Sequence, residues 1–174
     1  MKQFNFFSLL IIFILLPLKY THANNSVAIL DLDSLLEKTN AGKKIINELN
    51  LINQNNLNSL KEMENKIKSE QENINNQKNI ISNEELNKKI NNLNKEIQKF
   101  QNKKNELVNN FNTEKEKKLD LFFKEIIPII ENYIDKNEIN LVFDKKNIFI
   151  ANRKNNITEE IIKIIDERLE WTKN

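Results

Sequence analysis

The stretch NNQKNIISNEELNKKINNLNKEIQKF, residues 75–100, decides the fold of this chain. Most of its residues are Asn, Lys, Glu or Gln, which do not bury a core, yet Ile or Leu returns every three or four residues. That spacing is typical of an amphipathic helix with a narrow apolar stripe. The stretch therefore belongs either to one long rod or to a chain that turns back on itself at Ser82-Asn83-Glu84-Glu85.

Two runs of apolar residues with a seven-residue repeat flank this point and predict a coiled coil. The first run consists of Ile46, Leu49, Leu60, Met63, Ile67, Ile74 and Ile81. The second consists of Leu86, Ile90, Leu93, Ile97, Phe100, Leu107 and Phe111. The runs are out of phase, because continuing the first would place the charged residues Glu84 and Lys88 in the seam. Such a break marks either a stutter in a straight rod or a turn.

The residues at the break favour a turn. Ser82 with Glu85 three residues later is a capping box, which starts a new helix, so we expect the tip of a helical hairpin at residues 79–83. This arrangement places Ile74 near Ile90 and gives two arms roughly 60 Å long at 1.5 Å rise per residue. Polar residues weaken the predicted seam while fixing its register: Asn53, Asn56, Glu70, Gln77 and Lys104.

Residues 1–23 predict a secretory signal peptide. One lysine precedes an apolar run from Phe6 to Leu16, which is shorter than the ~20 residues that a membrane-spanning helix needs. The small residues Thr21 and Ala23 close the segment, so we expect cleavage after Ala23. An uncleaved anchor is the alternative. The sequence therefore predicts an exported chain.

The composition argues against catalysis. Residues 1–23 hold two of the 27 basic residues and no acidic one, so 25 basic side chains remain against 25 acidic ones, and net charge gives no reason to expect a nucleic-acid partner. The only histidine, His22, leaves with the signal, and cysteine is absent, so no Ser/His or Cys/His pair and no zinc site of these residues can form. Gly42, the single glycine, cannot build a phosphate-binding loop. Carboxylate pairs such as Glu159-Glu160 lie at predicted helix starts, where they interact with the helix dipole. We expect no enzymatic activity, no cofactor and no metal site.

Short β-rich segments flank the predicted coiled coil. SVAILDL, residues 26–32, predicts one strand. INLVFD at residues 139–144 and NIFIA at residues 147–151 predict a β-hairpin joined by Lys145-Lys146, with Asn147 in a left-handed conformation.

Two further signals shape the C-terminal part. Pro128 should interrupt and kink the returning helix where the arm meets a compact base. Thr158 predicts the N-cap of a last helix. The apolar face of that helix consists of Ile161, Ile162, Ile164, Ile165 and Leu169.

These segments predict a mainly α-helical fold with a small β body, from which a long antiparallel coiled-coil hairpin projects. Residues 24–44 and 124–174 form the body, and residues 45–123 form the arm. A body of this size buries too little surface to be stable alone, and open strand edges pair with other chains. We therefore expect an obligate oligomer whose protomers pool their strands, with Trp171 as a candidate contact.

Three motifs carry a resemblance to a known family. They are VAILDLDSLLEKTNAGKKI (residues 27–45), INLVFDKKNIFIA (139–151) and NITEEIIKIIDERL (156–169). Together with the signal peptide, the polar helical hairpin and the proline-bearing return helix, they make the chain similar to the Skp/OmpH family of periplasmic chaperones.

The resemblance implies a homotrimer whose strands form a small β-barrel body, with three helical prongs around a central cavity. The residues expected in this trimer body are Val27, Ile29, Leu141, Phe143, Ile148 and Ile150. It also implies an ATP-independent holdase that binds unfolded outer-membrane β-barrel proteins in the periplasm, with membrane contact at most transient.

Aromatic residues near the root of the arm are the candidate client contacts: Phe111, Phe122 and Phe123. Adjacent side chains on a helix cannot both face the same partner helix, so one of Phe122 and Phe123 should be core and the other exposed. A structural or tethering coiled-coil protein of the cell envelope is the alternative function.

Overall fold

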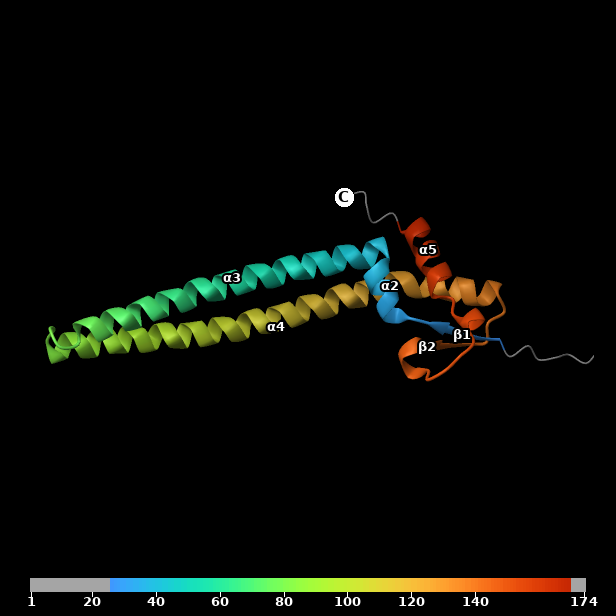
Figure 1. The fold of residues 1–174 in the computed structure, drawn as a ribbon. Coiled ribbons are helices and arrows are strands. Elements are labelled where there is room, and N and C mark those ends of the chain that lie inside the picture. The colour runs from blue at the N-terminus through green and yellow to red at the C-terminus, as the bar shows by residue number, and fades with distance from the viewer. Residues whose placement is uncertain (1–25, 170–174) are drawn as a thin grey trace, which may run out of the picture.

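The computed structural model describes residues 26–169, which form a long helical hairpin projecting from a small body (Figure 1). The elements in chain order are strand β1 (Val27–Leu30), helices α2 (Leu32–Lys38), α3 (Asn40–Gln77) and α4 (Asn83–Lys136), strand β2 (Leu141–Asp144) and helix α5 (Thr158–Arg168). The predicted mainly helical fold with a small β component is confirmed, whereas the barrel base and the trimer stay predictions. The predicted signal peptide and Trp171 lie outside the described residues.

The helices α3 and α4 run antiparallel and are joined by a turn at residues 78–82. With 38 residues, α3 is about 57 Å long. The hydroxyl of Ser82 accepts a hydrogen bond from the backbone N–H of Glu85 at 3.2 Å, which confirms the predicted cap of the second arm. Two ion pairs across the arms set their register: Lys66–Glu96 at 3.6 Å and Glu48–Lys118 at 2.7 Å.

Polar residues interrupt the seam between the arms, as predicted. Ile74 and Leu93 are buried there. Three of the polar seam residues are half-buried: Asn56, Glu70 and Gln77.

The predicted seam is wrong at Asn53 and Lys104, which are exposed. Their neighbours Ile52 and Lys103 are half-buried instead. A helix with 3.6 residues per turn drifts away from a strict seven-residue repeat, so the contact stripe passes to adjacent positions over several turns.

The helix α4 continues through Pro128 to Lys136, so the predicted interruption is wrong. Pro128 lies on the exposed side of the helix, and Lys124, four residues earlier, is exposed as well. Proline removes the N–H that would bind the Lys124 carbonyl. Because water can reach that carbonyl, the loss does not break the helix.

The strands β1 and β2 form a parallel two-stranded sheet, in register from Val27↔Leu141 to Leu30↔Asp144. Parallel neighbours need a crossover connection. Here α2, α3 and α4 make that connection, so the whole arm is inserted between two strands that pair in the body.

The predicted β-hairpin at residues 139–151 is not formed. After β2 the chain makes a single turn of 3-10 helix at Lys145–Asn147, where Asp144 Oδ1 accepts a hydrogen bond from the Lys146 N–H at 3.2 Å. Asn147 is not left-handed, since Glu138 is the only non-glycine residue with positive φ among residues 26–169. Asp side chains stabilise such local turns, and β2 finds its partner in β1 rather than in NIFIA.

The core lies where β1, α2, α5 and the last part of α4 meet (Figure 1). Its fully buried side chains include Leu35, Phe122, Ile126, Ile161 and Ile165. The predicted apolar face of α5 is confirmed, because Ile162 is buried too and Ile164 and Leu169 pack against the core. The helix α4 thus serves both the arm and the body.

Thr158 does not cap α5 as predicted. It is the first residue of the helix and is buried. Asn156 Oδ1 accepts hydrogen bonds from both the N–H and the hydroxyl of Thr158, at 3.0 and 2.6 Å. The Thr158 hydroxyl in turn accepts a hydrogen bond from the Asp31 N–H at 3.0 Å, so the threonine joins α5 to the end of β1.

Candidate functional site

The body carries apolar side chains that no described part of the chain covers. On β2, Leu141 is 56% exposed and Phe143 is 43% exposed, while beyond it Phe149 is fully exposed and Ile150 is 84% exposed. Within residues 26–169, β2 has β1 as its only neighbouring strand. Apolar side chains beside an open strand edge are typical of a surface that another chain covers.

The six residues predicted for the trimer body fall into two groups. Ile29 is buried in the single chain, and Val27 and Ile148 are half-buried. The exposed members are Leu141, Phe143 and Ile150. The sheet pairs Val27 with Leu141 and Ile29 with Phe143, so it brings four of the six together.

An ion pair fastens the segment after β2 to the start of α2. Asp31 is the N-cap of α2 and accepts a hydrogen bond from the Ser34 N–H at 3.0 Å. Its other oxygen binds the ammonium of Lys145 at 2.7 Å. The Lys145 hydrogen bond, helped by the Ser34 N–H, lowers the pKa of Asp31 to about 2. The segment Asp31-Leu32-Asp33-Ser34 contained a sequence signal for the N-cap of α2. No pattern in the sequence predicted that Asp31 pairs with Lys145, so far along the chain.

Two more polar contacts join α5 to the N-terminal helices. Lys38 binds Glu159 at 2.7 Å, which raises the pKa of the lysine. Asp166 Oδ1 accepts a hydrogen bond from the Asn40 N–H at 2.8 Å. These contacts tie α5 to α2 and to the first residue of α3.

The three candidate aromatic residues lie in different environments. Phe122 is fully buried, and its ring centroid lies 5.5 Å from that of Phe123 in an edge-to-face arrangement. Phe123 is half-buried against the core, and Phe111 is half-buried at the seam. Phe122 belongs to the core, as predicted for one of the adjacent pair, whereas the other, Phe123, is half-buried rather than exposed. Phe122 therefore has no surface to offer a partner, whereas Phe111 and Phe123 keep partial exposure.

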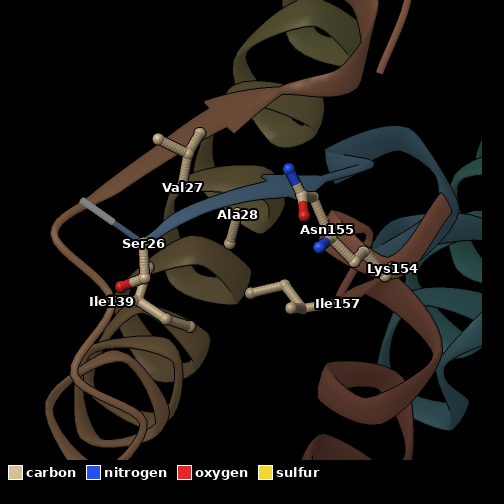
Figure 2. A pocket seen from close by; sticks show the side chains of 7 residues that line it. All are labelled: Ser26, Val27, Ala28, Ile139, Lys154, Asn155 and Ile157. Atoms are coloured by element: carbon tan, nitrogen blue, oxygen red, sulfur yellow. The ribbon is translucent and has the colours of Figure 1, made fainter. Parts of the chain in front are cut away.

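A pocket of about 520 Å³ opens between β1 and the turn before α5 (Figure 2). Figure 2 shows Lys154 and Asn155 together on one side and the apolar side chains of Ala28 and Ile157 facing the space. Lys154 is the only charged residue of its lining. The hydroxyl of Ser26, at its rim, donates to the Glu138 carbonyl. The lining offers no acid–base pair.

Within residues 26–169, no group of His, Cys, Asp and Glu is arranged to hold a metal ion. No helix there is both long and apolar enough to cross a membrane.

Comparison with known proteins gives one family and one fold. Residues 26–165 match the family described as outer membrane protein (OmpH-like). The crystal structure of a protein from Caulobacter crescentus CB15, named as an OmpH-like outer membrane chaperone, has the same fold, with a TM-score of 0.73. Its sequence is 18% identical, and the match covers 83% of this chain and 85% of that one. No curated protein sequence matches.

Proposed function

Because this chain belongs to the OmpH-like family of outer membrane proteins, we propose that it is an ATP-independent holdase chaperone for unfolded outer-membrane β-barrel proteins. The family consists of chaperones rather than enzymes, and we propose no catalytic activity, cofactor or metal. The structurally similar Caulobacter protein is itself named as an outer membrane chaperone.

The observation that carries this proposal is the form of the arm. It extends about 57 Å from a body whose core it shares, through Ile45 of α3 and Phe122 of α4. Unfolded barrel strands alternate apolar and polar residues and expose unpaired edges, so they aggregate in water. Arms that surround such a chain need only bind it weakly at many points, because the high effective concentration of the other binding points raises the overall affinity.

We propose that the arms surround a cavity because three chains assemble through their bodies. The uncovered Leu141, Phe143, Phe149 and Ile150 supply the apolar surface for that contact. The open edge of β2 supplies unpaired backbone groups. Residues 24–44 and 124–174 are the proposed assembly body, and residues 45–123 are the proposed arm.

The proposed location is the periplasm. The apolar segment of residues 6–16 and the small residues before position 24 support export with cleavage after Ala23. The chaperone would meet its clients there, between export and insertion, with membrane contact at most transient.

An aggregation assay tests the proposal. A urea-unfolded outer-membrane β-barrel protein is diluted into buffer with and without the protein, and light scattering is followed over time. The holdase proposal predicts suppressed scattering near one trimer per client, without nucleotide. Sedimentation equilibrium in the same buffer should give three times the chain mass. Scattering that is unchanged at a tenfold excess would contradict the holdase and leave the tethering alternative.

A further inference from the structure

The two edges of the arm differ in chemistry. On one edge, Glu96 of α4 binds Lys66 of α3 at 3.6 Å and Lys99 of its own helix at 2.7 Å. Together with Glu70, Asn92 and Lys95, these residues line a polar hollow of about 350 Å³. We call this side the paired edge, since Glu96 forms ion pairs with two of its three lysines.

The opposite side of α4 carries an apolar stripe. Ile90 and Val108 are separated by five full turns of 3.6 residues, so they point the same way, and Ile97 and Lys104 lie within about 40° of them. Lys99 is two and a half turns from Ile90 and points the other way. Ile90, Ile97 and Val108 are 39%, 37% and 50% exposed.

The helix α3 contributes to the same side. Leu57 lies two and a half turns before Lys66 and therefore points away from the paired edge. It is 52% exposed. The register set by Glu48–Lys118 and Lys66–Glu96 places Leu57 level with the turn of α4 that holds Val108. Three charged residues lie within about 40° of Leu57: Lys61, Glu64 and Lys68.

These eight residues define what we call the open edge: Leu57, Lys61, Glu64 and Lys68 of α3 with Ile90, Ile97, Lys104 and Val108 of α4. Its charged members are three lysines and one glutamate. Within residues 26–169, no ion pair engages Lys61, Lys68 or Lys104. The open edge is therefore both apolar and positively charged, although the chain after residue 23 has balanced charge.

We infer that the open edge is the surface on which the arm holds unfolded polypeptide segments that carry apolar and acidic side chains. The inference rests on the proposed function and assigns its client-binding surface. From Ile90 to Val108 the stripe is about 27 Å long, which matches about eight residues of extended chain. Apolar client side chains would cover Ile90, Ile97 and Val108, while client carboxylates would meet the unpaired lysines.

A lipid surface fits the open edge less well. Interfacial helices bury a broad apolar face several ångströms deep, whereas the exposed apolar residues of the open edge on α4 form a single line, Ile90, Ile97 and Val108. The stripe is also one residue wide on α4. An extended chain can follow such a narrow surface, while a membrane cannot.

The affinities of two labelled peptides test this inference. The probes are two fluorescein-labelled ten-residue peptides in which Val, Ser and Tyr alternate with charged residues, one with Glu and the other with Lys. At low salt, fluorescence anisotropy should show that the unaltered protein binds the acidic peptide at least fivefold more tightly. In the K61E/K104E variant that preference should vanish or reverse, since two charges that attract the acidic peptide become charges that repel it. In the L57S/V108S variant both peptides should bind severalfold more weakly.

The matched control is K88E/K95E, which makes the same change in charge. Lys88 and Lys95 are exposed like Lys61 and Lys104, and both point more than about 130° away from Ile90. This variant should keep the preference for the acidic peptide. Circular dichroism checks that all variants retain the helical arm.

Two outcomes would overturn the inference. One is an equal loss in K61E/K104E and K88E/K95E, which shows a general charge effect. The other is binding of vesicles with one-quarter anionic lipid through Lys61 and Lys104, without any preference between the peptides. In either case a protein that still keeps an unfolded barrel soluble remains a holdase, so the two proposals fail separately.

Discussion

Gly42, the only glycine of the chain, lies in α3 against the backbone of Leu36 in α2. A Cβ atom at this position would lie 1.9 Å from the Leu36 carbonyl oxygen, which is backbone and cannot move aside cheaply. The turn is fixed by Thr39, whose buried hydroxyl donates to the Leu35 carbonyl at 2.6 Å and accepts from the Gly42 N–H at 3.1 Å. The sequence alone indicated that this single glycine cannot build a phosphate-binding loop. The packing role of Gly42 depends on the contact between α2 and α3, which the spacing of apolar residues in the sequence does not predict.

The Asp31–Lys145 pair makes stability depend on pH. Because the pKa of Asp31 is about 2 in the folded chain against 3.8 ordinarily, the carboxylate adds stability that is complete above about pH 4 and is lost as the pH falls through 2. The contribution is up to about 2 kcal/mol, reduced by solvent around the exposed Lys145. Urea unfolding should show Asp31→Asn as less stable than the unaltered protein at pH 6, with the difference shrinking towards pH 2.

A companion variant tests the cause. In Lys145→Met the effect of Asp31→Asn at pH 6 should be smaller, because the two residues are coupled. If the two effects were additive, the lysine would not be the partner that lowers the pKa.

At the scale of elements, signals contained in one segment predicted the structure well. The phase break and the Ser82 cap located the turn, and the seven-residue repeat predicted the seam except at Asn53 and Lys104. Signals that depend on distant parts failed. LVFDKKNIFIA has the composition of a hairpin, but β2 pairs with β1, more than a hundred residues away. Pro128 is tolerated because its side of α4 is exposed. Which side of α4 is exposed depends on how the helix packs against the body. The open edge was missed because it requires the register of both arms.

Because polar residues interrupt the seam, replacing one of them with an apolar residue should stabilise the arm. Asn56 is half-buried between the arms, whereas Asn53 is exposed. Replacing Asn56 with Leu should raise the stability of the helices by about 1 kcal/mol, since it buries apolar surface in place of an amide. Thermal unfolding followed by circular dichroism measures this gain.

The control is Asn53→Leu, which the seven-residue repeat treats as an equivalent position. We expect a change below about 0.5 kcal/mol for it. A larger gain from Asn53→Leu than from Asn56→Leu would show that the repeat, rather than the observed burial, describes the seam.

At the scale of the whole molecule, we propose separate tasks for the body and the arm. The proposed assembly surface lies on β2 and the segment after it, and the proposed client surface lies on the open edge of the arm. Leu141 and Phe143 were expected in the trimer body, and in the single chain they are exposed. The structure of one chain does not tell which of its surfaces the proposed assembly covers. The trimer is a prediction from the resemblance alone, because no local pattern encodes the number of copies.

Removing the arm tests the central claim most directly. Glu48 and Lys118 bind each other at 2.7 Å, so deleting residues 48–118 and joining Asn47 to Leu119 through a short flexible turn adds little loop entropy. The measurement is light scattering of a urea-unfolded outer-membrane barrel protein diluted into this armless variant or the complete protein, with the mass of each checked by sedimentation. We predict an armless trimer that leaves scattering as high as buffer alone, while the complete protein suppresses it. An armless trimer that protects the client as well as the complete protein would contradict the account and assign binding to the body.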